Sequence, residues 1–270
     1  MPVRIVQSKQ NPRLKELRRA LIAPGREAGG GLALAGIEGP NLISEAVRAG
    51  LRIHCVFAAQ GSEHLLDGLH LLPQTEVLLM PRDVLAASLA TETPQPVAAL
   101  VEPPGWTWAH FLGDAGKIAP LIVVLAGLQD PGNLGTILRS AEAFGATGVV
   151  SLPGTVSAWN PKAVRASAGS VFRVPLLAAS AEECFARLRA GGVKIFSTAM
   201  RDGEPADRAD LNGAAAILIG NEGNGVDKTL AAEAGGAITI PCPGPVESLN
   251  AAIAASVLLY EASRQRGGRK

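Results

Sequence analysis

Residues 121–140 read LIVVLAGLQDPGNLGTILRS, and this stretch decides the fold of the second half of the chain. It begins with a run of mostly branched apolar residues, Leu121 to Ala126, and continues into a short polar turn. Pro131 and Asn133 then suit the start of a helix, and Gly145 suits its end. A buried strand followed at once by a helix is the unit from which parallel sheets covered on both faces are built.

The same alternation continues toward the C-terminus. Five further apolar runs follow, each separated from the next by a plausible helix: Gly148 to Leu152, Val171 to Pro175, Lys194 to Thr198, Ala215 to Ile219 and Ala237 to Ile240. The second half is therefore expected to be an α/β domain with a parallel sheet. Its ligand site is expected at the carboxyl ends of the strands.

The first half indicates a smaller α/β module. Short apolar runs at Leu32 to Gly36, Ile53 to Ala58, Glu76 to Met80 and Val97 to Val101 alternate with helix-like stretches at Asn41 to Ala49 and Arg82 to Ala90. A Pro-, Gly- and Trp-rich composition follows, which is typical of a linker. We place the boundary near residues 105–118, which predicts two domains, 1–108 and 118–270.

Residues 1–27 form the most basic segment, in which the spacing of Leu14, Leu17 and Leu21 predicts a short amphipathic helix. Its acids are Glu16 and, at its end, Glu27, and its basic residues are Arg4, Lys9, Arg13, Lys15, Arg18, Arg19 and Arg26. Two interpretations stay open: a solvated helix face, or contact with RNA phosphates.

Composition narrows the classes of function. The 270 residues are 47% hydrophobic, enough for a substantial core. The formal net charge of +1 is not typical of a strong nucleic-acid binder, so any nucleic-acid binding would have to come from local basic patches. The three cysteines, Cys55, Cys184 and Cys242, are scattered, and no histidine pair has metal-ligand spacing, so we expect buried cysteines and no metal site. The longest apolar run, near Leu121 to Leu128, is far too short to span a membrane, and with no signal-like N-terminus a cytoplasmic protein is expected.

Three segments carry candidate chemistry. In the first, Asn133 and Arg139 lie six residues apart on the expected helix, so both side chains face one cleft only if Asn133 is the N-cap of that helix. The free backbone N–H groups at the start of the helix suit a phosphate. In the second, residues 220–225 read GNEGNG at the end of an apolar run, and glycine permits close approach of backbone to a ligand. Each segment is also compatible with a purely structural role, as a helix cap or an ordinary turn.

The third segment, residues 240–250, reads IPCPGPVESLN and precedes an alanine-rich helix. Its prolines restrict the loop at low entropic cost, and small helical residues allow close packing. Ser248 and Asn250 serve either as helix caps or as groups that orient a substrate. The GNEGNG segment does not match GxGxxG, and the chain has no GxxxxGK[ST], so a dehydrogenase or an NTPase lacks its signature.

Together, these segments resemble in order and spacing the SpoU (TrmH-like) branch of the SPOUT methyltransferases. The resemblance is strong over residues 120–265 and includes NPKAVRASAGS at 160–170; Ser8 to Leu21 and Ile37 to Pro40 are similar, more weakly, to the L30e-like substrate-binding domain of such enzymes. One departure is Cys242-Pro243, where Met is more usual after Ile-Pro.

The resemblance implies a parallel sheet with a deep trefoil knot, and a homodimer whose S-adenosylmethionine pocket lies at the subunit interface. The implied catalytic residues are Asn133, Arg139, Glu222, Ser248 and Asn250. The implied cofactor-binding residues are Thr198, Ala199, Gly220, Asn221, Glu222, Ile240, Pro241, Ser248 and Leu249. Arg139 would come from the partner subunit and would position the ribose hydroxyl rather than take its proton, because arginine stays protonated.

The expected activity is methyl transfer to a ribose 2′-OH of RNA, with no metal. An L30e-like first domain favours 23S-type ribosomal RNA over tRNA. Two alternatives remain: a SPOUT base methyltransferase that acts on tRNA, and a catalytically silent L30e-like protein for RNA binding or ribosome assembly.

Overall fold

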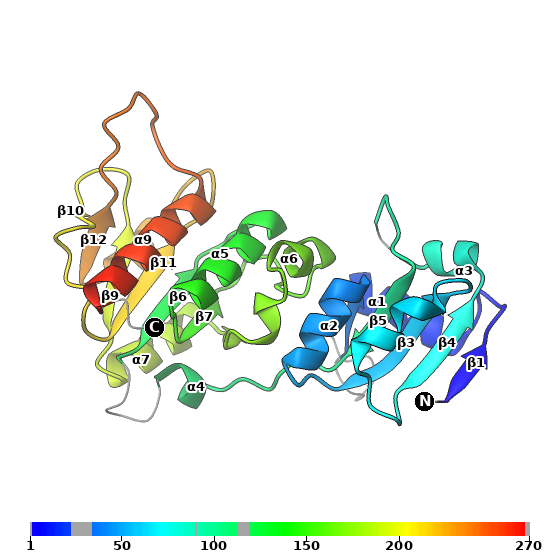
Figure 1. The fold of residues 1–270 in the computed structure, drawn as a ribbon. Helices are drawn as coiled ribbons and strands as arrows, with labels where there is room; N and C mark the ends of the chain where they lie inside the picture. Colours follow the sequence, from blue (N-terminus) through cyan, green and yellow to red (C-terminus); the bar gives the residue numbers. More distant parts are fainter. Residues whose placement is uncertain (1, 23–33, 90, 113–118, 268–270) are drawn as a thin grey trace. The chain divides into compact units, whose positions relative to one another are not determined.

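The computed structural model (Figure 1) describes residues 2–22, 34–89, 91–112 and 119–267. Its contacts divide the chain into two units, one made of Met1–Gly105 with Ser157–Phe172, the other of Trp106–Val156 with Arg173–Lys270. Residues 113–118 of the expected linker, and Arg26 of the basic segment, lie outside the described residues. The assignment of 1–108 and 118–270 to two separate domains stays a prediction.

The first unit contains a five-stranded mixed sheet in the order β1-β4-β3-β5-β2. The strands are β1 (Val3–Ile5), β2 (Ala35–Glu38), β3 (Ile53–Ala59), β4 (Glu76–Met80) and β5 (Val97–Val101). The edge strand β1 was not expected from the sequence, because its three residues are too short a run to indicate a strand; all three are exposed. The other four strands lie where the apolar runs predict them, although β2 begins three residues later than its run.

Three helices and two short 3₁₀ turns complete most of this unit: α1 (Pro12–Ile22), α2 (Pro40–Arg48), α3 (Arg82–Ala86), η1 (Glu63–Leu65) and η2 (Asp67–Leu69). The amphipathic helix predicted near the N-terminus is confirmed as α1, which buries Leu14, Leu17 and Leu21 against the sheet residues Phe57 and Leu100. The apolar spacing of α1 therefore serves core packing, and its basic residues lie around the remaining faces.

The segment Ser157–Phe172, which includes α6 (Pro161–Ala166) and η3 (Ser170–Phe172), packs with the first unit. The expected strand at Val171 to Pro175 is wrong, because Ala168 and Gly169 have positive φ angles of 50° and 91° and turn the chain into η3. The strand of this region begins only at Leu176, after Pro175.

The second unit contains a seven-stranded sheet in the order β10-β12-β9-β11-β6-β7-β8, in which every strand pair is parallel. The strands are β6 (Leu121–Leu125), β7 (Gly148–Ser151), β8 (Leu176–Ala178), β9 (Lys194–Thr198), β10 (Glu204–Pro205), β11 (Ala215–Ile219) and β12 (Gly236–Thr239). The expected α/β fold with a parallel sheet is confirmed. The trefoil knot stays a prediction, and the two-residue β10 is too short for a sequence pattern to reveal.

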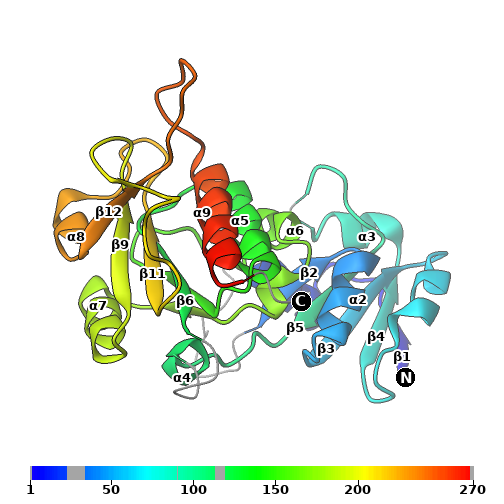
Figure 2. The same cartoon turned by 60° about the vertical axis from the view of Figure 1, so that its left-hand side comes forward.

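Helices cover both faces of this sheet: α4 (Trp108–Leu112) and α7 (Ala181–Ala190) on one, α5 (Pro131–Ala143) and α9 (Ala251–Gln265) on the other, with α8 (Lys228–Ala232) near the edge (Figure 2). Ile122 and Val124 of β6 pack with Phe111 of α4 and Phe185 of α7. Because neighbouring strand residues point to opposite faces, the alternate residues of β6 face the α5 and α9 layer.

The helices α5 and α9 lie side by side in both views and are joined by a hydrogen bond of 2.7 Å between the Ser140 and Ser256 hydroxyls. At the far end of α9, Arg266 donates from Nε to the Leu211 carbonyl and from Nη1 to the Ala119 carbonyl, both at 2.8 Å. Burial lowers the pKa of Arg266. These hydrogen bonds of Arg266 fix the C-terminal end of α9. The N-terminus of α9 lies at the carboxyl ends of the strands, where the ligand site is expected.

Within the described ranges, no helix combines the length and the apolar character that a membrane crossing requires.

Candidate functional site

A pocket of about 760 Å³ lies at the carboxyl ends of β9, β11 and β12. Its walls come from the loops that follow these strands and from the start of α9, so three segments far apart in the sequence meet there (Figure 1). The lining contains every residue expected to bind the cofactor: Thr198, Ala199, Gly220, Asn221, Glu222, Ile240, Pro241, Ser248 and Leu249. A pocket of this volume is in the range of small-molecule and cofactor sites, about 300–1,000 Å³.

The loop after β11 is held in a fixed shape by its own backbone. Asn221 and Gly225 exchange two backbone hydrogen bonds, both of 2.9 Å, and Gly225 adopts a positive φ of 68°. The Asn221 side chain donates to the Gly127 carbonyl at 3.0 Å and accepts from the Gly223 N–H at 2.8 Å. Asn221 thus shapes this wall of the pocket, and a ligand here meets its backbone.

Gly220→Ala is expected to weaken binding of the pocket's ligand about tenfold to a hundredfold. A Cβ at Gly220 would lie 2.0 Å from the Gly225 carbonyl carbon and 2.2 Å from the Val226 nitrogen, so the loop has to open. Gly223→Ala is the matched control, since its Cβ meets no atom closer than the Asn221 Oδ1 at 3.4 Å. Calorimetric titration of both variants with S-adenosylmethionine checks this, and equal affinities would contradict it.

Three side chains from the three motifs form a continuous hydrogen-bonded relay at the pocket edge. Asn250 Nδ2 donates to Asn133 Oδ1 at 3.0 Å, and Asn133 Nδ2 donates to Glu222 Oε1 at 3.1 Å. Glu222 also accepts from the backbone N–H groups of Asp130 at 3.0 Å and Gln129 at 3.2 Å. The relay links α5 to the β11 loop and to α9, whose relay residues lie 89 and 117 residues further along the chain than Asn133.

The charge of Glu222 fixes the orientation of this relay. Burial raises the pKa of Glu222, but the hydrogen bonds from the Asp130 N–H, the Asn133 amide and the Gln129 N–H outweigh it and hold the pKa below its usual range. An ionised carboxylate accepts hydrogen bonds and donates none. Asn133 must therefore turn its NH₂ toward Glu222 and its oxygen toward Asn250.

Asn133 is not the cap of its helix. Asp130 is the N-cap of α5 and accepts from the N–H groups of Gly132 and Asn133. The six-residue spacing predicted that Asn133 and Arg139 face one cleft only with Asn133 at the cap, and within this chain they do not share one: Asn133 contacts Glu222, whereas Arg139 does not line the pocket. Asn250 does cap α9, accepting from the Ala252 and Ile253 N–H groups, and uses its NH₂ for the relay. The cap role and the site role of Asn250 are thus compatible.

Arg139 and Ser248 take no part in the hydrogen bonds of the relay. Ser248 is exposed and lines the pocket. Arg139 is exposed on α5, does not line the pocket, and forms no hydrogen bond or ion pair with the part of the chain that the structure describes. Of the predicted catalytic residues, Glu222 and Ser248 thus line the pocket, and Asn133 and Asn250 are linked to it through the hydrogen bonds that end at Glu222. Arg139 has neither connection within one chain.

The cysteines behave in two ways. Cys55 and Cys184 are buried, and burial raises the pKa of each to about 12, as suits inert core residues. Cys242 is exposed in the loop after Pro241, so the expectation that all three are buried is wrong. Among the described residues, no group of three or more His, Cys, Asp or Glu side chains is placed to hold a metal.

Met200, Arg201 and Glu247 also line the pocket, and the sequence reasoning missed them. Glu247 directly precedes Ser248, and Met200 and Arg201 directly follow Thr198 and Ala199. Their position beside predicted site residues was therefore an available signal.

Comparison with known proteins assigns both parts of the chain. Residues 120–260 match the model of the SpoU rRNA Methylase family, and residues 37–106 match RNA 2′-O ribose methyltransferase substrate binding. The 23S rRNA (guanosine(2553)-2′-O)-methyltransferase RlmP of Bacillus subtilis is 32% identical over 83% of this chain and 86% of its own. The 23S rRNA (guanosine-2′-O-)-methyltransferase RlmB of Xanthomonas campestris is 36% identical over 58% of this chain and 64% of its own.

Solved structures agree with these relatives. The AdoMet-bound rRNA methyltransferase of Sinorhizobium meliloti has a TM-score of 0.82 and 29% identity, covering 97% of this chain and 98% of its own. The SpoU methyltransferase AviRb of Streptomyces viridochromogenes, in complex with AdoMet, has a TM-score of 0.80 and 29% identity, covering 96% of this chain and all of its own. The family inferred from the three motifs is confirmed: the chain belongs to the SpoU rRNA Methylase family.

Proposed function

We propose that this protein transfers the methyl group of S-adenosylmethionine to a ribose 2′-OH of 23S-type ribosomal RNA. The observation that carries the proposal is the relay Asn250–Asn133–Glu222, which brings all three family motifs to the edge of one pocket. The two curated relatives described above are named for ribose 2′-O transfer to 23S rRNA, which favours a ribose over a base and rRNA over tRNA. An intact relay also argues against a silent RNA-binding protein.

The pocket suits the cofactor in size and in chemistry. Glycine and proline backbone at Gly220 and Pro241 allows a ligand to approach the main chain, and the Thr198 hydroxyl is already engaged with the Leu218 carbonyl, which leaves its backbone for binding. The ionised Glu222 at the rim suits a cationic group. When bound, S-adenosylmethionine supplies an activated methyl group on its sulfonium.

The side chains at the rim orient the acceptor. We assign Ser248 and Asn250 to the ribose, with Asn133 and Glu222 holding the Asn250 amide in place through the relay. Arg139 binds the RNA phosphate and orients the 2′-hydroxyl, whose proton leaves to solvent because a guanidinium stays protonated. Accurate placement of this kind accounts for a large share of enzymatic rate enhancement.

The active form we propose is a homodimer in which the partner's copy of α5 brings Arg139 to the pocket. A stripe of exposed apolar side chains on α9 supports this: Ile253, Val257 and Tyr260 are 53%, 38% and 56% exposed and recur at helical spacing on one face. Contiguous apolar patches of this kind mark protein interfaces. Because ribosomal RNA is the proposed substrate, we place the enzyme in the cytoplasm.

RNA contact by α1 is expected to depend on Lys15 and Arg19. Arg13 is paired with Glu16 at 2.8 Å and with Glu76 at 3.4 Å, so reversal of its charge would break ion pairs within the unit. Lys15 forms no ion pair among the described residues, and the Arg19 side chain contacts only the Lys15 carbonyl.

The double variant Lys15→Glu, Arg19→Glu is expected to lower RNA affinity and to flatten its dependence on salt, because fewer counterions are released on binding. Arg82→Glu, an exposed charge reversal on α3, is the control. Filter binding over a series of salt concentrations measures both effects. An unchanged RNA affinity with an unchanged salt dependence would show that the basic face of α1 is only solvated and does not contact RNA.

The experiment that tests the proposed function is a map of 2′-O-methyl groups in ribosomal RNA from cells with and without the gene. We expect one ribose methyl group to disappear from the large-subunit rRNA of the deletion strain. Loss of a base methyl group instead would favour the base methyltransferase, and an unchanged map of rRNA and tRNA would favour the silent protein.

A further inference from the structure

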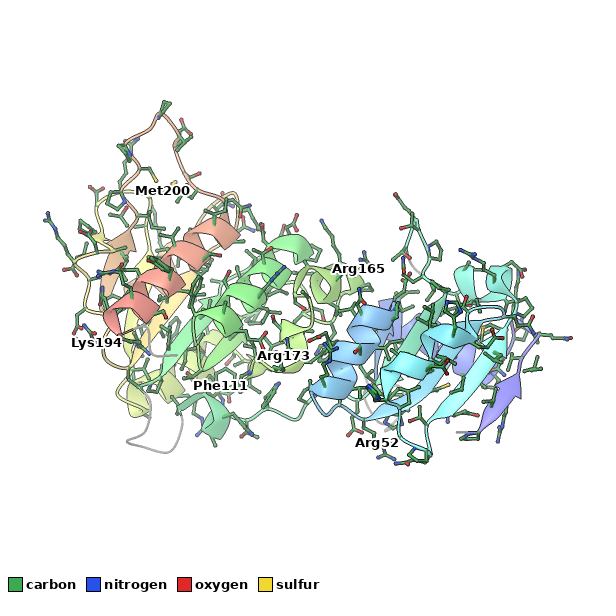
Figure 3. The ribbon with its side chains drawn as sticks, viewed as in Figure 1. Arg52, Phe111, Arg165, Arg173, Lys194 and Met200 are labelled. Atoms are coloured by element: carbon green, nitrogen blue, oxygen red, sulfur yellow. The ribbon has the colours of Figure 1, made fainter. Side chains whose placement is uncertain are left out.

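A second, smaller hollow of about 380 Å³ adjoins the pocket. Its lining residues are Met200, Arg201 and Glu247, and all three also line the larger pocket, so the two spaces are continuous. Met200 lies at the base of the loop between β12 and α9 (Figure 3), and Glu247 belongs to that loop, next to Ser248. The hollow is therefore at the rim where the acceptor ribose is proposed to sit.

The side chains of this hollow are available to a ligand. Arg201 and Glu247 are exposed, and neither forms a hydrogen bond or ion pair with any residue that the structure describes. Met200 is 69% exposed, which is unusual for a large apolar side chain. The hollow thus presents one guanidinium and one carboxylate without a hydrogen-bonding partner among the described residues, together with one exposed thioether.

The backbone beneath these side chains is fixed. The Thr239 hydroxyl donates to the Met200 carbonyl at 3.2 Å. A Cβ at Gly203 would lie 2.9 Å from the Ile238 carbonyl carbon, so the chain after Arg201 packs directly on β12. The hollow is therefore built on the sheet edge, with one wall held by hydrogen bonding and close backbone packing.

We propose that this hollow receives the base of the methylated nucleotide and selects guanine, an inference that rests on the proposed function. The Watson–Crick edge of guanine presents one acceptor, O6, beside two donors, N1–H and the N2 amine. A carboxylate accepts from both donors at once, and a guanidinium donates to O6. Glu247 and Arg201 supply these groups, and Met200 offers an apolar surface to the face of the base. Sequence-specific recognition of RNA commonly reads an unstacked base in this way.

The other bases use this pair less fully. Uracil offers a single N–H to Glu247, and adenine and cytosine each offer one amino group, so one carboxylate oxygen remains without a strong donor. The amino-acid end of S-adenosylmethionine also carries opposite charges. Because Arg201 and Glu247 line both spaces, titration of their variants with S-adenosylmethionine separates this alternative from a base site.

The first test identifies the nucleoside. The purified full chain, methyl-labelled S-adenosylmethionine and rRNA from cells that lack the gene are incubated together, and the RNA is digested to nucleosides. We expect the label in 2′-O-methylguanosine. Label in another 2′-O-methylnucleoside would overturn the guanine inference and leave the proposed function intact. The absence of any labelled 2′-O-methylnucleoside would overturn both.

The second test uses a synthetic RNA that contains the mapped site, with guanosine or inosine at the target position. Inosine lacks the N2 amine, so wild-type kcat/KM is expected to fall about tenfold. Glu247→Gln is expected to lower kcat/KM on guanosine about tenfold to a hundredfold, and then to show no further loss on inosine. Arg201→Gln should lower kcat/KM equally on both RNAs, since both bases carry O6.

Glu182→Gln on α7, an exposed carboxylate outside the pocket, is the matched control and should behave as wild type. Thermal unfolding establishes that Glu247→Gln is folded, and calorimetry with S-adenosylmethionine separates a role in base recognition from a role in the cofactor pocket, which Glu247 also lines. An S-adenosylmethionine affinity that falls by the same factor as kcat/KM would assign Glu247 to the cofactor and overturn the inference. An inosine penalty that persists in Glu247→Gln would overturn it as well.

Discussion

Arg139→Ala is expected to reduce methyl transfer about a hundredfold to a thousandfold while leaving S-adenosylmethionine affinity nearly unchanged. The structure explains the separation of the two effects, because Arg139 is exposed on α5 and does not line the cofactor pocket of its own chain. Among the described residues no side chain pairs with it, so its removal should cost little stability. Single-turnover methyl transfer and calorimetry measure the two quantities separately.

Arg187→Ala on α7 is the matched control, an exposed arginine of the same unit that is also outside the pocket. Arg139→Lys should recover only part of the activity, because an ammonium lacks the planar fork of the guanidinium. An equal loss of cofactor binding and transfer in Arg139→Ala would contradict the role we assign to Arg139.

Mixed dimers test which subunit supplies Arg139. One subunit carries Arg139→Ala, and its partner carries Gly220→Ala, which weakens cofactor binding but keeps Arg139. The cofactor is held at a concentration that fills the wild-type pocket and leaves the Gly220→Ala pocket largely empty. If Arg139 acts across the interface, one composite site regains activity, up to half of the wild-type level. If Arg139 acts within its own chain, both sites stay inactive.

Asn133→Asp is expected to lower kcat/KM about a hundredfold at neutral pH, because it displaces the side chains that orient the acceptor ribose. Glu222 is ionised and accepts from Asn133 at 3.1 Å, so an aspartate at 133 would place two carboxylates against each other. The Asn250 side chain would lose its fixed partner geometry at the same time. Steady-state kinetics on rRNA, with thermal unfolding as the control for folding, measure the loss.

Two readouts separate the relay from a general loss of structure. Facing carboxylates raise the pKa of one of them, so acidification should restore part of the activity of Asn133→Asp, whereas wild-type Glu222, with its lowered pKa, gains nothing. Glu222→Gln combined with Asn133→Asp removes the pair of facing carboxylates and should recover part of the activity. The recovery is incomplete, because the Glu222 Oε1 that accepts from Asn133 also accepts from the Asp130 N–H, and an amide nitrogen in its place would face that donor. A double variant as inactive as the single one would show that repulsion between the two carboxylates is not the cause of the loss.

Much of the second unit could be predicted because periodicity and turn chemistry agree there. The strands at Lys194–Thr198 and Ala215–Ile219 match their apolar runs residue for residue, since each is bounded by clear turn signals. The strand predicted at Val171 to Pro175 was wrong, because apolar character alone does not distinguish a buried 3₁₀ turn from a strand. The positive φ at Ala168, which redirects the chain, has no signature in an alanine.

The hydrogen bonds of the relay could not be predicted from the sequence. The motifs indicated that Asn133, Glu222 and Asn250 belong to one site, but only the packing of α5 against α9 brings the two amides into contact. Likewise, Asp130 rather than Asn133 is the helix cap, a choice between two neighbouring cap-forming residues that depends on local backbone geometry. Met200, Arg201 and Glu247 adjoin predicted site residues in the sequence, but only the meeting of two loops shows that they share one hollow.

The measurement that tests the central claim most directly is calorimetric titration of the purified full-length protein with S-adenosylmethionine in the absence of RNA. The loops after β9, β11 and β12 are argued to form the cofactor site, so saturable binding is predicted for the wild type and for Gly223→Ala, with marked weakening for Gly220→Ala. A folded wild-type protein with no measurable affinity, or a Gly220→Ala variant that binds as tightly as the wild type, would contradict the account.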